Sequence, residues 1–159
     1  MPLRLINVKT LKLESFPDRD RQTPPYAILS HRWGEEEDEL SFDEMNAEEH
    51  WSAMLELKQR WEYDLSTLGN SAFYQLRTDM TKSQNLAAPM RYRKVVRSCM
   101  KAEQQAISYI WIDTCCIDKR SSSELTEAIN SMFAWYRDAA VCYAYLNVVE
   151  RADPMLSTP

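Results

Sequence analysis

Two apolar runs, each ending among polar and reactive side chains, dominate the hydrophobic pattern of this chain. The first is Tyr26–Ser30 and the second is Tyr109–Asp113. Short apolar runs of this kind are typical of buried strands. If the two strands are parallel neighbours, their carboxyl ends lie at the same edge of a sheet, where open α/β folds bind ligands. We therefore expect a binding crevice there. Its expected side chains are Ser30, His31, Arg32, Trp33 and Asp113.

The remaining pattern predicts an α/β fold with a mainly parallel sheet flanked by helices. The apolar periodicity predicts a helix over 91–107 before the second strand and another helix between that strand and a third one at 141–146. A strand–helix–strand unit of this kind has a right-handed crossover in nearly all known cases. Residues 141–146 are apolar throughout, so we expect both faces of that strand to be covered. Residues 3–13 alternate as two short edge strands or a hairpin do.

The helix between the second and third strands has a clear start signal. Ser121 and Glu124 stand in the Ser-x-x-Glu relation of a capping box, in which each side chain bonds the backbone N–H of the other residue. An apolar stripe through Leu125, Ile129 and Tyr136 is expected to pack on the sheet. Glu124 and Glu127 share a helix face, as an acid/base pair would, but acidic residues are also favoured in any first helical turn.

The region 46–90 is expected to be an irregular and partly helical insertion, with a helix near 47–62. We expect a single domain over residues 1–150 and a disordered tail over 151–159. Because no closing helix or strand is predicted after the third strand, the domain is expected to be truncated on its C-terminal side.

Composition excludes several classes of function. The formal charge of −5 and the isoelectric point near 5.1 argue against a dedicated nucleic-acid binder, since phosphate recognition needs a concentrated basic surface. The basic residues between Arg91 and Lys101 are expected to form a solvated helix face. The chain has no apolar run long enough to cross a bilayer and no signal-peptide pattern, so we expect no membrane partner and a cytoplasmic location.

Glycine and cysteine usage narrow the chemistry further. Only two glycines are present, which excludes a glycine-rich phosphate-binding loop. The four cysteines have apolar neighbours and no zinc-ribbon spacing, so we expect free, buried thiols and no metal site.

The residues at the strand ends have two interpretations. A hydroxyl, an imidazole, a guanidinium and an indole could bind a phosphate, a ribose and a stacked base. Alternatively, Trp33 fills the core and His31 only caps a carbonyl group. Asp113 needs a partner, because burying a lone carboxylate is costly. Arg32, the helix after Ser121 or a ribose hydroxyl could each serve.

Three ordered blocks of sequence resemble the heterokaryon incompatibility (HET) domain of filamentous fungi, and Arg4–Asn7 fits the usual lead-in to that domain. The blocks are Tyr26–Gly34 with the following acids and Phe42-Asp43, then Tyr109–Lys119, then Ser123–Phe133 with Trp135-Tyr136 and Ala139–Leu146.

HET domains are similar in turn to Toll/interleukin receptor-type (TIR) domains. This resemblance implies a TIR-like fold and a role in fungal nonself recognition and programmed cell death signalling. It also implies NAD as a substrate rather than as a tightly bound cofactor. The catalytic glutamate of such NAD-cleaving domains lies on a later segment whose motif is absent from this chain, so no catalytic residue is assigned and enzymatic activity stays open.

The alternative function is a non-catalytic interaction module that associates with itself or with a partner signalling protein. Aromatic residues of the insertion could form its exposed patch, because interface cores favour such side chains. The residues expected in this patch are Trp51, Trp61, Phe73 and Tyr74.

Overall fold

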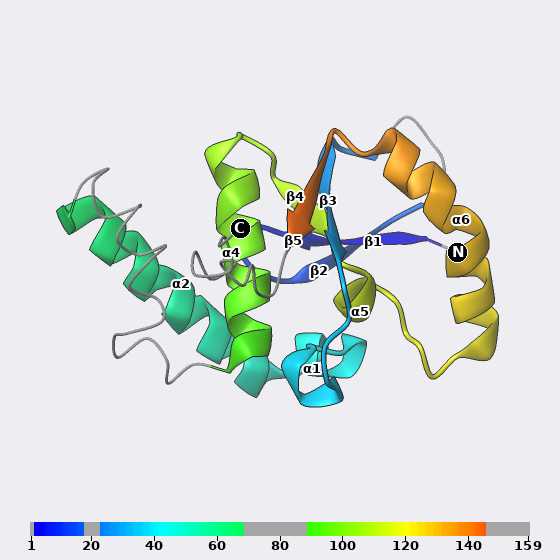
Figure 1. Cartoon of the computed structure of the whole chain (residues 1–159), viewed down its shortest axis with the longest axis horizontal. Coiled ribbons are helices and arrows are strands. Elements are labelled where there is room, and N and C mark those ends of the chain that lie inside the picture. The colour runs from blue at the N-terminus through cyan, green and yellow to red at the C-terminus, as the bar shows by residue number, and fades with distance from the viewer. Residues whose placement is uncertain (1, 18–22, 69–88, 146–159) are drawn as a thin grey trace, which may run out of the picture.

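The computed structural model describes residues 2–17, 23–68 and 89–145. Among these residues, a five-stranded sheet in the order β2-β1-β4-β3-β5 lies between α2 and α4 on one side and α6 on the other (Figure 1). The fold is therefore mixed α/β, as predicted. The strands are β1 (Leu3–Asn7), β2 (Leu13–Phe16), β3 (Tyr26–His31), β4 (Tyr109–Trp111) and β5 (Val141–Tyr145).

The two strands that defined the predicted crevice are parallel neighbours. β3 lies between β4 and β5 and pairs in parallel with both, with Ala27 opposite Ile110 and Ile28 opposite Cys142. β1 pairs antiparallel with β2, as the predicted hairpin requires. It also pairs antiparallel with β4, so β1 is an inner strand rather than an edge strand and the sheet is only partly parallel.

The helices fall close to their predicted places. Four of the described helices come between β3 and β4 in the chain, and two come between β4 and β5. α4 ends before the predicted residue 107, because Ala106 has a positive φ of 57° and the Ile107 N–H bonds back to the Ala102 carbonyl oxygen. The helices are η1 (Glu36–Asp38), α1 (Phe42–Asn46), α2 (Glu48–Leu68), α4 (Met90–Gln104), α5 (Asp113–Cys116) and α6 (Ser122–Asp138).

Only half of the predicted capping box at α6 forms. The Ser121 side chain accepts a hydrogen bond from the Glu124 N–H at 3.3 Å. The Glu124 carboxylate does not return to Ser121; it accepts hydrogen bonds from Arg4 of β1 and from the Asp118 N–H. A guanidinium offers stronger, charge-assisted bonds than a neutral amide, which accounts for the change of partner. Glu124 therefore ties the start of α6 to the sheet and is not half of an acid/base pair.

The predicted packing face of α6 is right at Leu125, which packs against the core, and at Tyr136, whose ring lies 6.1 Å from the Trp111 ring, but it is wrong at Ile129. The buried side chains are Ala128 and Trp135, whereas Ile129 is 59% exposed and Phe133 is 79% exposed. The Trp135 ring lies 5.5 Å from the Trp111 ring of β4, centroid to centroid. Because Trp135, the largest side chain of the helix, is buried against the sheet, Ile129 and Phe133 face solvent.

β5 is not covered on both faces, contrary to the prediction. It is the outermost strand of the described sheet, and Cys142 and Ala144 are exposed on one of its faces. The strand is apolar although α6 leaves one of its faces exposed. The expectation of buried thiols is therefore wrong for Cys142 and right for the other three cysteines.

Two further expectations about the α2–α4 layer are wrong. Trp61 is buried, and Trp51 is half-buried against the core, so they form no exposed aromatic patch. Phe73 and Tyr74 lie outside the described residues, as does the predicted tail at 151–159. Lys94 is buried rather than part of a solvated face, since its ammonium group pairs with Glu39. No helix within the described ranges is long and apolar enough to span a membrane.

Candidate functional site

The predicted site lies where the chain leaves β3 and β4 in opposite directions. From β3 the chain runs to α2 and α4 on one side of the sheet, and from β4 it runs through α5 to α6 on the other side (Figure 1). Connections that diverge from adjacent parallel strands leave a hollow outside their carboxyl ends, where α/β folds place ligands. The last residue of β3 is His31, and Asp113 follows β4 at the start of α5.

His31 is the innermost residue of the site. Its side chain is 1% exposed, and its Nε2 atom lies 3.3 Å from the Glu39 carboxylate and 3.7 Å from the Asp113 carboxylate. Nε2 nevertheless has no hydrogen-bond partner, because neither contact has hydrogen-bond geometry. A buried imidazole thus stands between two carboxylates without bonding either one. It does not cap a carbonyl group through Nε2, which was the simpler interpretation.

Glu39 is held on both of its oxygens. The Lys94 ammonium group donates to Oε2, and the Gly34 N–H donates to Oε1 at 3.0 Å. Burial raises the pKa of Glu39. The hydrogen bonds from Lys94 and Gly34 and the positive charge of Lys94 outweigh this effect and lower the pKa overall. Glu39 is therefore ionised at neutral pH and has satisfied oxygens.

Asp113 connects the buried histidine to the surface. Its Oδ2 atom accepts a hydrogen bond of 2.6 Å from the Trp33 indole N–H, and its Oδ1 atom accepts one of 2.8 Å from the Thr114 N–H. The partner that a buried carboxylate requires is therefore Trp33. Neither Arg32 nor the helix after Ser121, which were the two partners expected within the protein, fills that role.

Trp33 is the exposed aromatic residue of the site. It is 61% exposed, which excludes the interpretation that it fills the core. The indole is fixed at its N–H by Asp113, and the Lys119 ammonium group lies 4.0 Å from the ring centroid. An exposed aromatic ring with a cation over its face is suited to stacking with a planar or cationic group.

The other two predicted residues take different positions. Arg32 is exposed and precedes Trp33 in the chain. Ser30 lies on the opposite face of β3 from His31, because side chains alternate along a strand. There it lies beside Tyr136 of α6: burial raises the pKa of that phenol, and the hydrogen bond with Ser30 opposes the rise.

The structure thus brings together three of the predicted residues and adds three that the sequence analysis missed. Glu39 was hidden in an acidic run and Lys94 in a basic helix, and no local pattern distinguished them from solvated charges. No group of three or more His, Cys, Asp or Glu in the described part of the chain could hold a metal ion. The predicted members are His31, Trp33 and Asp113, and the added members are Glu39, Lys94 and Lys119.

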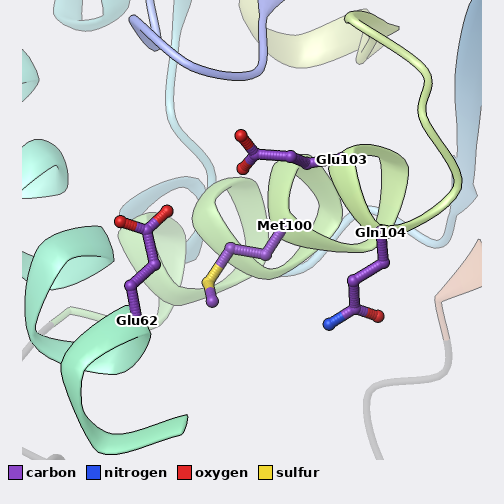
Figure 2. Close-up of a pocket in the computed structure, with 4 residues that line it drawn as sticks. All are labelled: Glu62, Met100, Glu103 and Gln104. Carbon is purple, nitrogen blue, oxygen red and sulfur yellow. The ribbon is translucent and has the colours of Figure 1, made fainter. Parts of the chain in front are cut away.

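A separate hollow of about 240 Å³ lies between α2 and α4 and is lined by polar residues and one methionine (Figure 2). Its two carboxylates, Glu62 and Glu103, both bind the buried Lys58 ammonium group, at 2.7 and 3.0 Å. Both carboxylates of this hollow are therefore already paired with the same ammonium group, and we assign the ligand site to the strand ends instead.

The fold and the site define an α/β domain with a cluster of polar side chains at the carboxyl ends of two parallel strands. The heterokaryon incompatibility protein (HET) family matches residues 26–157, and this chain belongs to that family. The chain is 36% identical over 126 residues to the vegetative incompatibility protein HET-E-1 of Podospora anserina. The match covers 79% of this chain but 7% of that relative. No solved structure matches the chain.

Proposed function

We propose that this domain acts in fungal nonself recognition and signals programmed cell death by binding a nicotinamide nucleotide in the crevice at the strand ends. Membership of the HET family and the name of the Podospora anserina relative support the incompatibility role. The observation that carries the ligand proposal is the exposed Trp33 ring, anchored on Asp113 beside a buried histidine.

Each part of the nucleotide has a matching group at the crevice mouth. The Trp33 face can stack with a base or with the cationic nicotinamide ring, which would replace the Lys119 ammonium group there. Arg32 and the displaced Lys119 can pair with the phosphates. The Asp113 carboxylate can accept hydrogen bonds from ribose hydroxyls. His31 is buried beneath these groups and supports them without touching the ligand.

NAD is proposed as a substrate rather than as a resident cofactor. Cleavage of the bond to nicotinamide develops positive charge on the ribose, which a nearby carboxylate must stabilise. Asp113 and Glu39 are the carboxylates at the crevice, and both are already hydrogen-bonded. We therefore keep binding and cleavage as separate measurements.

Binding is tested by calorimetric titration of the protein with NAD, using Trp33→Ala as the site variant. Stacking of a base on an aromatic side chain contributes about 1–3 kcal/mol, so affinity should fall roughly 5- to 150-fold. Phe133→Ala is the matched control, because it removes another exposed aromatic ring, on α6 and outside the proposed site. Equal NAD affinities for the two variants, or no NAD binding by the parent protein, would contradict the proposal.

Cleavage is tested by following nicotinamide release from NAD over time. Binding without release would leave a nucleotide-sensing crevice and would reject catalysis by this chain. Release that Asp113→Asn abolishes, with NAD affinity retained, would make Asp113 the stabilising carboxylate.

The second candidate function, an interaction module, is supported by the apolar side of α6. Ile129, Phe133 and Tyr136 are exposed there, next to the exposed face of β5. Exposed apolar patches often mark contact surfaces for the same or another protein. Light scattering with and without NAD separates the candidates: oligomers indifferent to NAD favour assembly, and a monomer that NAD stabilises favours the crevice.

A further inference from the structure

We propose that Lys94 is a positioning residue of the site: by binding Glu39, it holds that carboxylate away from a hydrogen bond with His31 and so leaves Asp113 free to orient Trp33. The inference deepens the proposed function, because it concerns how the same site is kept ready for its ligand. It makes no use of the ligand itself, so it can be tested on the free protein.

A continuous line of contacts connects Lys94 to the protein surface. Lys94 projects from α4 with a side chain only 4% exposed and binds Glu39 Oε2. That same oxygen lies 3.3 Å from His31 Nε2, and Nε2 lies 3.7 Å from Asp113 Oδ1. The other oxygen of Asp113 accepts the Trp33 N–H.

The surroundings of His31 supply few other charges. From α4 comes Lys94, from the segment after η1 comes Glu39, and from the start of α5 comes Asp113. On the sheet, Tyr145 of β5 pairs with His31. Two further cations belong to the site: Arg32 follows His31 in the chain and is exposed, and the Lys119 ammonium group lies over the Trp33 ring. The charges closest to Nε2 are thus two carboxylates, one of which Lys94 neutralises.

The direction of the effect follows from this charge arrangement. Without the Lys94 ammonium group, Glu39 would be a buried carboxylate with an unsatisfied oxygen beside His31, which is costly. Protonating His31 would then supply the missing cation. An imidazolium would donate from Nε2 and attract Asp113 as well, which would weaken the hydrogen bond that the Trp33 indole N–H donates to Asp113.

The experiment is an NMR titration of the free protein, in which Lys94→Met is compared with the parent. The chain contains only two histidines, so the imidazole signals of His31 and His50 are separable and His50 is an internal reference. An opposite charge within about 4–6 Å shifts a pKa by about 1–3 units, so the pKa of His31 should rise by that amount. The Trp33 indole N–H signal, assigned with Trp33→Phe, should move upfield as its hydrogen bond weakens.

Lys58→Met is the matched control. Lys58 is another buried lysine of the α2–α4 layer whose ammonium group binds carboxylates, here Glu62 and Glu103, so its loss should destabilise the protein to a similar degree. It lies away from the crevice and should leave both signals in place. Lys94→Met combined with Glu39→Gln removes both members of the pair and should return the pKa of His31 close to that of the parent.

The inference is overturned if Lys94→Met leaves the titration of His31 and the Trp33 signal as unchanged as Lys58→Met does, or if the pKa of His31 falls. If Lys94→Met does not fold, Glu39→Gln alone decides the question. It leaves the Lys94 cation without its carboxylate, so the pKa of His31 should fall. An unchanged pKa in that variant would equally reject the role of the pair. Both measurements are made on the free protein, so neither depends on whether the protein binds NAD.

Discussion

Replacement of Glu124 by Gln is expected to destabilise the protein at neutral pH by about 2 kcal/mol. Glu124 accepts two hydrogen bonds from the Arg4 guanidinium and one of 2.7 Å from the Asp118 N–H, and its side chain is 16% exposed. Hydrogen bonds to charged groups contribute about 1.5–3 kcal/mol, and the amide can keep only part of this set. In urea unfolding, the loss corresponds to a midpoint lower by roughly 1 M.

The pH dependence provides the sharper test. The Arg4 hydrogen bond lowers the pKa of Glu124 below its ordinary value of 4.5; burial opposes this, and the Asp118 N–H reinforces it. A carboxyl group with a lowered pKa stabilises the fold above the ordinary value, and that contribution is lost as the pH falls through the lowered pKa. The difference in unfolding free energy between the parent and Glu124→Gln should therefore be constant from pH 7 to about pH 5 and shrink below pH 4.5.

The control variant is Glu56→Gln, which removes an exposed carboxylate of α2 and should change stability by less than about 0.5 kcal/mol. A Glu124→Gln difference as small as this would show that the pair contributes no more than a surface ion pair. An equal difference at pH 3 and pH 7 would show that the ionised carboxylate is not its source. Either result would refute the reasoning.

Two other predictions concern the core and the thiols. Trp135→Ala should cost about 3–5 kcal/mol in thermal or urea unfolding, because Trp135 is buried against Trp111; a loss below about 1 kcal/mol would contradict the packing of α6. Iodoacetamide should modify Cys142 alone in the folded protein, as read by peptide mass spectrometry, since burial raises the pKa of the other three thiols. Modification of Cys115 at a similar rate in the folded protein would contradict this.

The strands of the sheet and the proximity of His31 to Asp113 could be predicted, because both depend on local sequence patterns. Apolar runs identified β3 and β4, and the parallel pairing on which the expected site depended is present in the structure. That pairing alone places His31 and Asp113 at one edge, where the structure has them 3.7 Å apart. The family resemblance is shown as well. The relation to TIR domains and the binding of NAD stay predictions.

The rest depends on contacts between segments that are distant in the sequence. Nothing near Lys94 distinguishes it from the solvated cations of the same helix; only the fold brings Glu39 to it across 55 positions. The exposure of Ile129 on α6 has a similar cause. The apolar periodicity is compatible with several packing faces, and the contact between Trp135 and Trp111 selects one of them. Ser30 was assigned to the crevice because it is next to His31, although adjacent strand residues face opposite sides.

The two outer strands of the described sheet differ in how they would receive an additional strand. β2 carries Glu14 and is followed directly by Pro17, and charge and proline both discourage edge pairing. β5 (Val141–Tyr145) contains neither. We therefore expect a strand-forming peptide from another molecule to pair with β5 and not with β2. The described sheet can then be extended at one edge only.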